Sequence, residues 1–158
     1  MHSRTRWWWL GLAGAALLMP SAAQAAVDFG IRAGIYTDAE EAFVGGELLM
    51  PVARSVFFNP NIEYVFIQDG DLITFNADFH YDFWSDRALT VWAGAGAALI
   101  NSDPPPQRRR DDDDETDFGV NILAGVGAVR GSVRPYLQGK VVLSDDSEFV
   151  IAVGVRFF

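Results

Sequence analysis

Apolar and polar residues alternate without interruption from Ile73 to Phe83, within a segment that begins at Leu72. Apolar side chains occupy the odd positions and polar ones the even positions, in the run Ile73, Thr74, Phe75, Asn76, Ala77, Asp78, Phe79, His80, Tyr81, Asp82 and Phe83. A period of two is the spacing of a β-strand, because successive side chains of a strand point to opposite faces. This segment is therefore predicted to be a strand that separates an apolar environment from a polar one.

Comparable segments recur along the chain and predict eight strands. They span residues 27–36, 43–51, 56–67, 72–83, 89–100, 117–129, 133–143 and 148–158. The connections at 53–55, 85–87 and 130–132 are tight, and among the others only 101–116 is long. Such a pattern favours an all-β fold, an eight-stranded antiparallel up-and-down transmembrane β-barrel of the bacterial outer membrane. Because Pro60 cannot donate a ladder hydrogen bond, we expect a bulge at residues 59–61 of the third strand.

Side-chain size predicts which face of these strands points inward. A soluble lipocalin-like barrel would show the same period with an apolar interior, but the interior of eight strands is only wide enough for side chains to fill it. The face that carries the charges is rich in small residues: Gly30, Gly34, Gly45, Gly94, Gly96, Gly119, Gly125, Gly127, Ala152 and Gly154. The apolar face instead carries bulky residues such as Phe29, Ile62, Phe75 and Phe118. The apolar face is therefore predicted to contact lipid, with aromatic girdles at both edges.

The N-terminus has the features of a secretory signal peptide. Arg4 and Arg6 precede an apolar run from residue 7 to residue 19, Pro20 follows, and Ala23 and Ala25 flank Gln24. The apolar run is shorter than the roughly 20 residues that a membrane-spanning helix needs, which makes an uncleaved anchor the weaker reading. Cleavage after Ala25 would leave one domain over residues 26–158, the outer-membrane barrel. No later apolar stretch is long enough for a transmembrane helix, and no cofactor is expected.

The charges divide into an acidic outer end and a nearly balanced lumen. With both termini in the periplasm, the outer connections and their edges hold fifteen acidic residues against only Arg108, Arg109 and Arg110. The lumen face holds a predicted ion network: Asp28, Arg32, Glu47, Glu63, Asp78, His80, Asp82, Arg134, Lys140 and Arg156. Because unpaired buried charges are costly, we expect these groups to pair and to plug the lumen. Arg156 on the last strand and Asp28 on the first are predicted to pair across the closing seam.

Two segments carry a resemblance to a known family. The stretch FNPNIEYVF at residues 58–66 and the ending AVGVRFF at 152–158 resemble OmpA/OmpX-type small outer-membrane barrels, together with the signal peptide and the eight strands. The resemblance covers the mature chain and implies an integral protein of the outer membrane that contacts its lipid and lipopolysaccharide. It also implies that the barrel-insertion machinery reads a terminal phenylalanine. Phe158 is the candidate, but Phe157 is in phase with the outward residues of its strand and is the second candidate.

His80 is the only histidine of the predicted mature chain and its candidate catalytic or metal-binding residue. His80 lies between Asp78 and Asp82 on the lumen face. Residues two apart on a strand are about 7 Å apart, so catalysis or metal binding there would require groups from other strands. Resemblance to the small barrels that act on lipid A would require a histidine paired with serine near the outer leaflet, and no serine lies on the inner face of this strand. We therefore expect a non-enzymatic protein without a bound metal, in which His80 is a hydrogen-bonded lumen residue.

The outer connection at 101–116 is the other segment with potential chemistry. Its acidic run Asp111, Asp112, Asp113, Asp114 and Glu115 follows three prolines and three arginines, a composition typical of a solvated loop. The sharper hypothesis is that it collects divalent cations, and through them lipopolysaccharide phosphates, or binds a surface partner. Binding of nucleic acid is not expected, because the net charge of the chain is −9. The leading function is a structural or surface-interaction role, and the alternative is transport of small or hydrophobic solutes through a narrow barrel.

Overall fold

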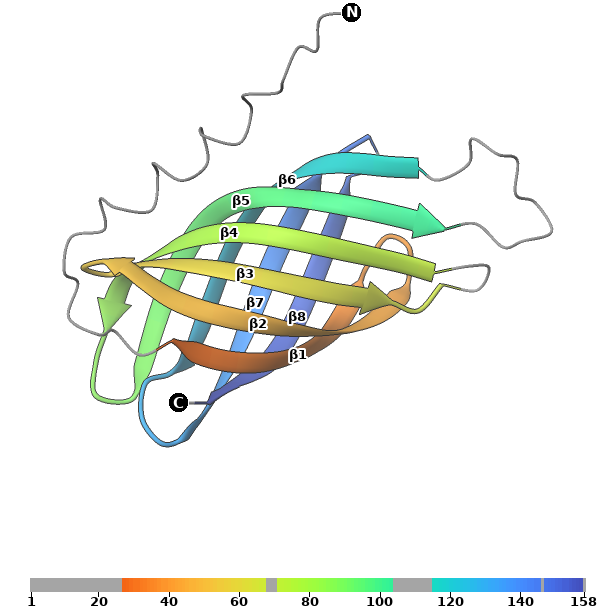
Figure 1. Ribbon diagram of the computed structural model, residues 1–158. Coiled ribbons are helices and arrows are strands. Elements are labelled where there is room, and N and C mark those ends of the chain that lie inside the picture. The colour runs from red at the N-terminus through yellow and green to blue at the C-terminus, as the bar shows by residue number, and fades with distance from the viewer. Residues whose placement is uncertain (1–26, 68–70, 104–114, 146, 158) are drawn as a thin grey trace, which may run out of the picture.

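The computed structural model describes residues 27–67, 71–103, 115–145 and 147–157, which form a closed barrel of eight strands (Figure 1). The strands are β1 (Asp28–Tyr36), β2 (Glu41–Ala53), β3 (Val56–Val65), β4 (Asp71–Ser85), β5 (Leu89–Asp103), β6 (Glu115–Ala128), β7 (Val133–Leu143) and β8 (Glu148–Phe157). Each strand is antiparallel to the next, and β8 pairs with β1 to close the sheet. The predicted fold is confirmed, whereas the predicted signal peptide lies outside the described residues.

The two ends of the barrel differ in their connections. We call the end that holds the start of β1 and the end of β8 the inner end, and the opposite one the outer end (Figure 1). The inner turns are short, and the β4–β5 turn is closed by Asp86, whose carboxylate accepts the backbone N–H groups of Ala88 and Leu89. These hydrogen bonds hold the pKa of Asp86 below its ordinary value. No helix in the described part of the chain is long and apolar enough to cross a membrane.

At the outer end β5 and β6 are longer than the alternation predicts, whereas β3 ends two residues earlier, at Val65. β5 continues to Asp103 and β6 begins at Glu115, because Asn101 pairs with Thr116 and Ser102 with Glu115. The side-chain amide of Asn101 donates to the Thr116 hydroxyl at 3.3 Å across this extension. Polar side chains in these last rungs break the alternation although the backbone pairing goes on. Residues 101–103 and 115–116 of the predicted loop at 101–116 therefore belong to β5 and β6.

The faces of the strands follow the predicted assignment. Bulky apolar side chains point outward and are about half exposed, as at Phe29 (52%), Phe75 (51%) and Phe79 (50%). Several of them pack as pairs on the outer surface, including Phe58 on Phe79 with ring centroids 4.7 Å apart. Glycines line the lumen where other groups approach closely. A Cβ atom at Gly94 would lie 2.1 Å from the Phe79 carbonyl oxygen, so no larger residue fits there without displacing the backbone.

The expected bulge at Pro60 is wrong. Asn61 lies opposite Glu47 and Phe58 opposite Met50 in one continuous register, and the pairing of β3 with β4 is also unbroken. Asn59 supplies the physical reason, because its side-chain amide donates to the Leu48 carbonyl at 2.7 Å. In this register Leu48 lies opposite Pro60, so the amide replaces the hydrogen bond that proline cannot donate. Irregularities occur instead between residues 51 and 53 of β2 and between residues 82 and 84 of β4.

Candidate functional site

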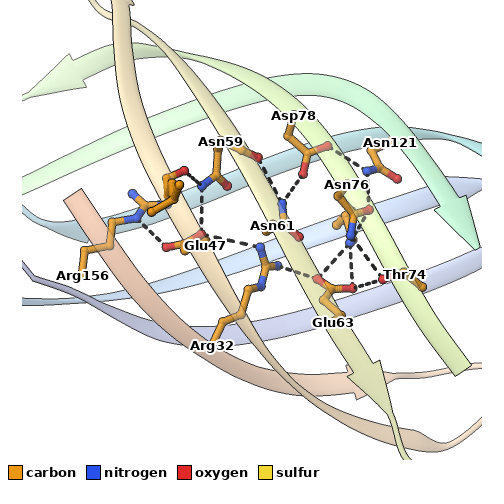
Figure 2. A network of polar contacts seen from close by, with 12 residues as sticks. Arg32, Glu47, Asn59, Asn61, Glu63, Thr74, Asn76, Asp78, Asn121 and Arg156 are labelled. Atoms are coloured by element: carbon orange, nitrogen blue, oxygen red, sulfur yellow. Dashed lines mark hydrogen bonds and ion pairs between the residues drawn. The ribbon is translucent and has the colours of Figure 1, made fainter. Parts of the chain in front are cut away.

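A cluster of five charged side chains crosses the middle of the lumen (Figure 2). The Arg32 guanidinium of β1 lies between two carboxylates, 3.2 Å from Glu63 of β3 and 3.7 Å from Glu47 of β2. Lys140 Nζ of β7 lies 3.1 Å from Glu63, and Arg156 Nε of β8 lies 2.8 Å from Glu47 Oε1. Three cations and two carboxylates from five strands therefore pair in the interior, where all five side chains are buried. We call this set the central ion cluster.

Glu63 is the residue with the most partners in the central ion cluster. Besides its two cations, its carboxylate accepts the Tyr36 hydroxyl at 2.6 Å and the Thr74 hydroxyl at 3.2 Å. Lys140 in turn donates to the Asn76 side-chain carbonyl at 3.3 Å. Glu63 has no exposed surface, so these groups take the place of the water that a carboxylate would otherwise bind. The arrangement neutralises and fixes a buried anion.

A row of carboxamides continues from this cluster toward β6. Asp78 accepts the side-chain amides of Asn61 at 3.0 Å and Asn121 at 2.8 Å, and Asn121 also donates to the Asn76 side-chain carbonyl at 2.8 Å. Asn59 joins this row to the ion cluster, because its amide donates to Glu47 at 3.1 Å. Figure 2 shows these side chains pointing toward one another from β2, β3, β4 and β6. Asp78 is thus held by amides, with no direct cation contact in the described part of the lumen.

The inner end of the lumen holds the remaining charges of the predicted network. Asp28 pairs with Arg134 of β7, and Asp82 accepts the Thr90 hydroxyl at 3.0 Å. His80 Nε2 lies 3.5 Å from Asp82, and its ring is stacked between Phe57 and Trp92 with centroids 5.4 and 5.5 Å away. The ten predicted network residues therefore all face the lumen, in a central group and an inner group.

The predicted ion pair between Asp28 and Arg156 is wrong, although both side chains face the lumen at the seam. Arg156 lies opposite Gly30 in the β1–β8 register. The Glu47 side chain occupies the space above that glycine, since a Cβ atom at Gly30 would lie 2.7 Å from Glu47 Oε1. Arg156 consequently reaches over Gly30 to Glu47, and Asp28 pairs with Arg134 instead.

Four large aromatic side chains lie in the lumen, and the sequence analysis did not predict them there. Tyr36 and Phe43 pack edge to face near the outer end, with ring centroids 5.6 Å apart, and Trp92 and Tyr136 pack near the inner end, 6.0 Å apart. The Arg156 guanidinium lies 4.4 Å from the Tyr136 ring centroid. Position along the strand was the available signal, because each of the four has the same parity as the glycines and charges of its own strand. Their bulk is accommodated by facing glycines, since a Cβ atom at Gly125 would lie 2.4 Å from the Trp92 ring.

Two lumen cavities lie at opposite ends of the barrel. The outer one measures about 370 Å³ and ends on Tyr36, Thr74 and Asn76. The inner one measures about 80 Å³ and is lined by residues that include His80 and Arg156. No residue lines both cavities, and Glu63 and Lys140 of the central ion cluster line neither. The charged middle of the lumen therefore separates the two ends.

The two other predicted sites, the terminal phenylalanines and the acidic run at 111–115, lie largely outside the described residues. Phe157 ends β8 with its ring 6.2 Å from that of Phe29, while Phe158 lies outside the described residues, so the insertion signal stays a prediction. The acidic residues 111–114 also lie outside them, and of Glu115 only the backbone is described. Within the described residues, no three histidine, cysteine, aspartate or glutamate side chains are grouped so as to hold a metal ion.

Comparisons with known proteins support the fold. No protein-family model and no curated protein sequence matches the chain. Among solved structures, it is similar to the N-terminal β-barrel domain of Pseudomonas aeruginosa OprF, with a TM-score of 0.69 and 16% identity over 83% of this chain and 95% of that one. The chain is also similar to Neisserial surface protein A (NspA), with a TM-score of 0.61 and 15% identity over 83% of this chain and 93% of that one. For the outer membrane enzyme PagL the TM-score is 0.53, with 14% identity over 82% of this chain and 98% of that one. These likenesses show the fold of small eight-stranded barrels of the outer membrane.

Proposed function

We propose that this chain is a non-enzymatic integral protein of the bacterial outer membrane with a structural or surface-interaction role. The observation that carries the proposal is the combination of an outward belt of half-exposed bulky apolar side chains with ionised groups buried inside. Soluble monomers rarely expose contiguous apolar patches larger than a few hundred square ångströms. A closed barrel of this polarity is instead stable in a bilayer, where the belt contacts acyl chains and every strand edge is paired.

The contacts of the polar groups favour a non-enzymatic role. Glu63, Asp78 and Arg156 are engaged by other side chains of the barrel, and His80 is enclosed between two aromatic rings. A catalytic acid or base must reach its substrate within hydrogen-bond distance, and Glu63 and Asp78 line neither of the two lumen cavities. The likeness to PagL, an outer membrane enzyme, concerns the fold and supplies no catalytic residues for this chain.

Localisation and fold can be tested together. Outer-membrane fractions of Gram-negative cells that express the full chain are run on a denaturing gel with and without heating. The expected result is a membrane-associated species whose migration changes on heating, because a lipid-embedded barrel resists detergent until heated. A mature chain that remains folded and monodisperse in buffer without detergent would overturn the proposal.

A surface role is proposed for the acidic outer end. Fifteen acidic residues lie in or beside the outer connections, and the Asp111–Glu115 run dominates the longest of them. Carboxylates gathered on one end attract divalent cations, which bridge to the phosphates of lipopolysaccharide. Replacing residues 111–115 by serine and asparagine is expected to weaken the magnesium or calcium dependence of association with lipopolysaccharide-coated surfaces. Unchanged dependence would reject this role for the loop.

Passage of small solutes is the second candidate, and one buried amide favours it. Neither the amide nitrogen nor the amide oxygen of the Gln138 side chain has a hydrogen-bond partner among the described residues, although the side chain is buried. Buried polar atoms without protein partners usually bind internal water, which would be the beginning of a solvent path. Single-channel recording in planar bilayers separates the two candidates. Steady conductance would support passage, and silence would support the closed lumen.

A further inference from the structure

The outer cavity of about 370 Å³ has walls of two kinds, and we call it the vestibule. Its bottom is formed by buried residues, the polar Thr74 and Asn76 beside Tyr36, Ala98 and Val142. Leu72 and Ile100 form part of its walls. Its rim is formed by residues that include Ala39, which is exposed. The vestibule is therefore open to solvent at the outer end and closed at its base.

An apolar layer underlies the vestibule. Tyr36, Ala98 and Val142 belong to one buried cluster with Phe43, Val65, Val150 and Ala152. Leu72 and Ile100 pack against this cluster. Below it the Tyr36 hydroxyl and Thr74 donate to Glu63, which ties the base of the vestibule to the central ion cluster. The deep part of the vestibule thus combines a preformed apolar surface with the buried polar residues Thr74 and Asn76, and buried hydrogen bonds hold it in place.

The rim of the vestibule is acidic. Four carboxylate residues line it, Glu41, Asp117, Asp145 and Glu148, and no lysine, arginine or histidine does so among the described residues. Glu148 Oε2 is buried without a hydrogen-bond partner in the described part of the chain, and Glu41 lines the same rim. A cation placed here would be attracted by both carboxylates. These side chains are not grouped as metal ligands, which favours an organic cation over a metal ion.

We propose that the vestibule binds a small amphiphilic organic cation, with the apolar body on the Tyr36, Ala98 and Val142 surface and the ammonium group at the carboxylate rim. The volume is at the lower end of that found for small-molecule pockets and suits a body of roughly 8–12 non-hydrogen atoms. Anions are excluded by the rim charge, and neutral molecules of the same shape gain only the apolar contact. This binding site is independent of the surface role proposed above.

The test uses the full mature chain in nanodiscs of zwitterionic lipid, with benzyltrimethylammonium as the probe. Benzyl alcohol and benzoate are its neutral and anionic counterparts. Binding is followed by NMR of labelled alanine and valine methyl groups, including Ala98 and Val142. The cation is expected to shift both methyl signals saturably, with an affinity at least about fivefold above that of benzyl alcohol, while benzoate causes no shift. Equal affinity for the cation and the alcohol, or no saturable shift at these methyl groups, would overturn the proposal.

Variants separate the roles of base and rim. Ala98→Phe fills the base and is expected to abolish saturable binding of the cation, read from the Val142 methyl signal. The pair Glu41→Gln and Glu148→Gln leaves the base intact and is expected to lower affinity for the cation about fourfold or more, without affecting benzyl alcohol. Glu40→Gln is the matched control, because Glu40 carries the same charge in the adjacent turn but does not line the vestibule.

Each outcome of the variant experiments either supports or rejects the proposed site. Correct folding is checked by heat-modifiable migration, and the rim pair stays informative if Ala98→Phe fails to fold. Unchanged cation binding in the rim pair, or an equal loss in Glu40→Gln, would show general attraction to the acidic outer end and would reject a site in the vestibule. Loss confined to the rim pair and the filled base would support it.

Discussion

Replacing Glu63 by glutamine tests whether the middle of the lumen is truly dry. Glu63 neutralises Lys140, whose Nζ lies 3.1 Å from both carboxylate oxygens, and Arg32, whose nearest nitrogen lies 3.2 Å away. After Glu63→Gln, both cations would remain buried with Glu47 as the remaining carboxylate of the central ion cluster, 3.7 Å from Arg32. Removing one partner of a buried pair costs about 3–5 kcal/mol, because the other charge stays in the interior uncompensated. A loss of that size in unfolding free energy is expected.

Charge compensation predicts a partial rescue. The double variant Glu63→Gln with Lys140→Met removes one anion and one cation, so the described cluster keeps Glu47 between its two arginines. We expect it to regain at least about 2 kcal/mol of the loss, which is the coupling that a double-mutant cycle measures. Glu40→Gln, at the exposed outer turn, is the control and should change stability by less than about 0.5 kcal/mol.

The assay is urea unfolding of the mature chain in phosphatidylcholine vesicles. Trp92 in the lumen and Trp84 on the outer surface report the transition by fluorescence, since these are the tryptophans of the mature chain. A loss below about 1 kcal/mol for Glu63→Gln, with no coupling to Lys140→Met, would refute the reasoning. It would mean that water reaches these charges in the folded barrel, and a conducting lumen would then become the better interpretation.

Three further results are expected in the same assay. Gly94→Ala should lower the free energy of unfolding by about 1–3 kcal/mol, because its Cβ atom would meet the backbone of β4. Gly46→Ala should have little effect, because its Cβ atom would lie 3.9 Å from the Gly30 carbonyl oxygen. Asn59→Ala should lower the free energy of unfolding by about 1–3 kcal/mol, because it leaves the Leu48 carbonyl without its donor. Adding Pro60→Val should restore part of that free energy, because valine supplies a backbone N–H. Raising salt from 0.1 to 1 M should leave the wild-type transition almost unchanged, because buried pairs are screened far less than exposed ones.

The face of each strand that points into the lumen was predictable, because it depends on the order and size of the residues along that strand. Parity along a strand assigns each side chain to a face, and the volume of the residues on each face identifies the lumen. The same parity places Trp92 and Tyr136 inside. Volume argues against such large aromatics in a narrow lumen, and they fit because glycines such as Gly125 face them.

The pairing of charges was not predictable because it depends on reach across the lumen. Asp28 and Arg156 satisfy every local criterion for a pair, yet Glu47 from the next strand competes for Arg156 through the space above Gly30. The bulge expected at Pro60 failed for a related reason, since a neighbouring amide satisfied the acceptor. In both cases the outcome is set by side-chain lengths in three dimensions, which an alternating pattern along one strand does not contain.

The interior therefore consists of three layers with different consequences for function. The central ion cluster and the carboxamides hold one another, and changing any of them alters stability before it alters recognition. The inner end is packed with aromatic rings and offers a cavity of only about 80 Å³. At the outer end the apolar layer beneath the vestibule meets a carboxylate rim, so a ligand can gain apolar contact and charge neutralisation there without disturbing a buried ion pair. The ligand site that we propose therefore lies at the outer mouth, and the barrel below it is expected to hold that surface rigid.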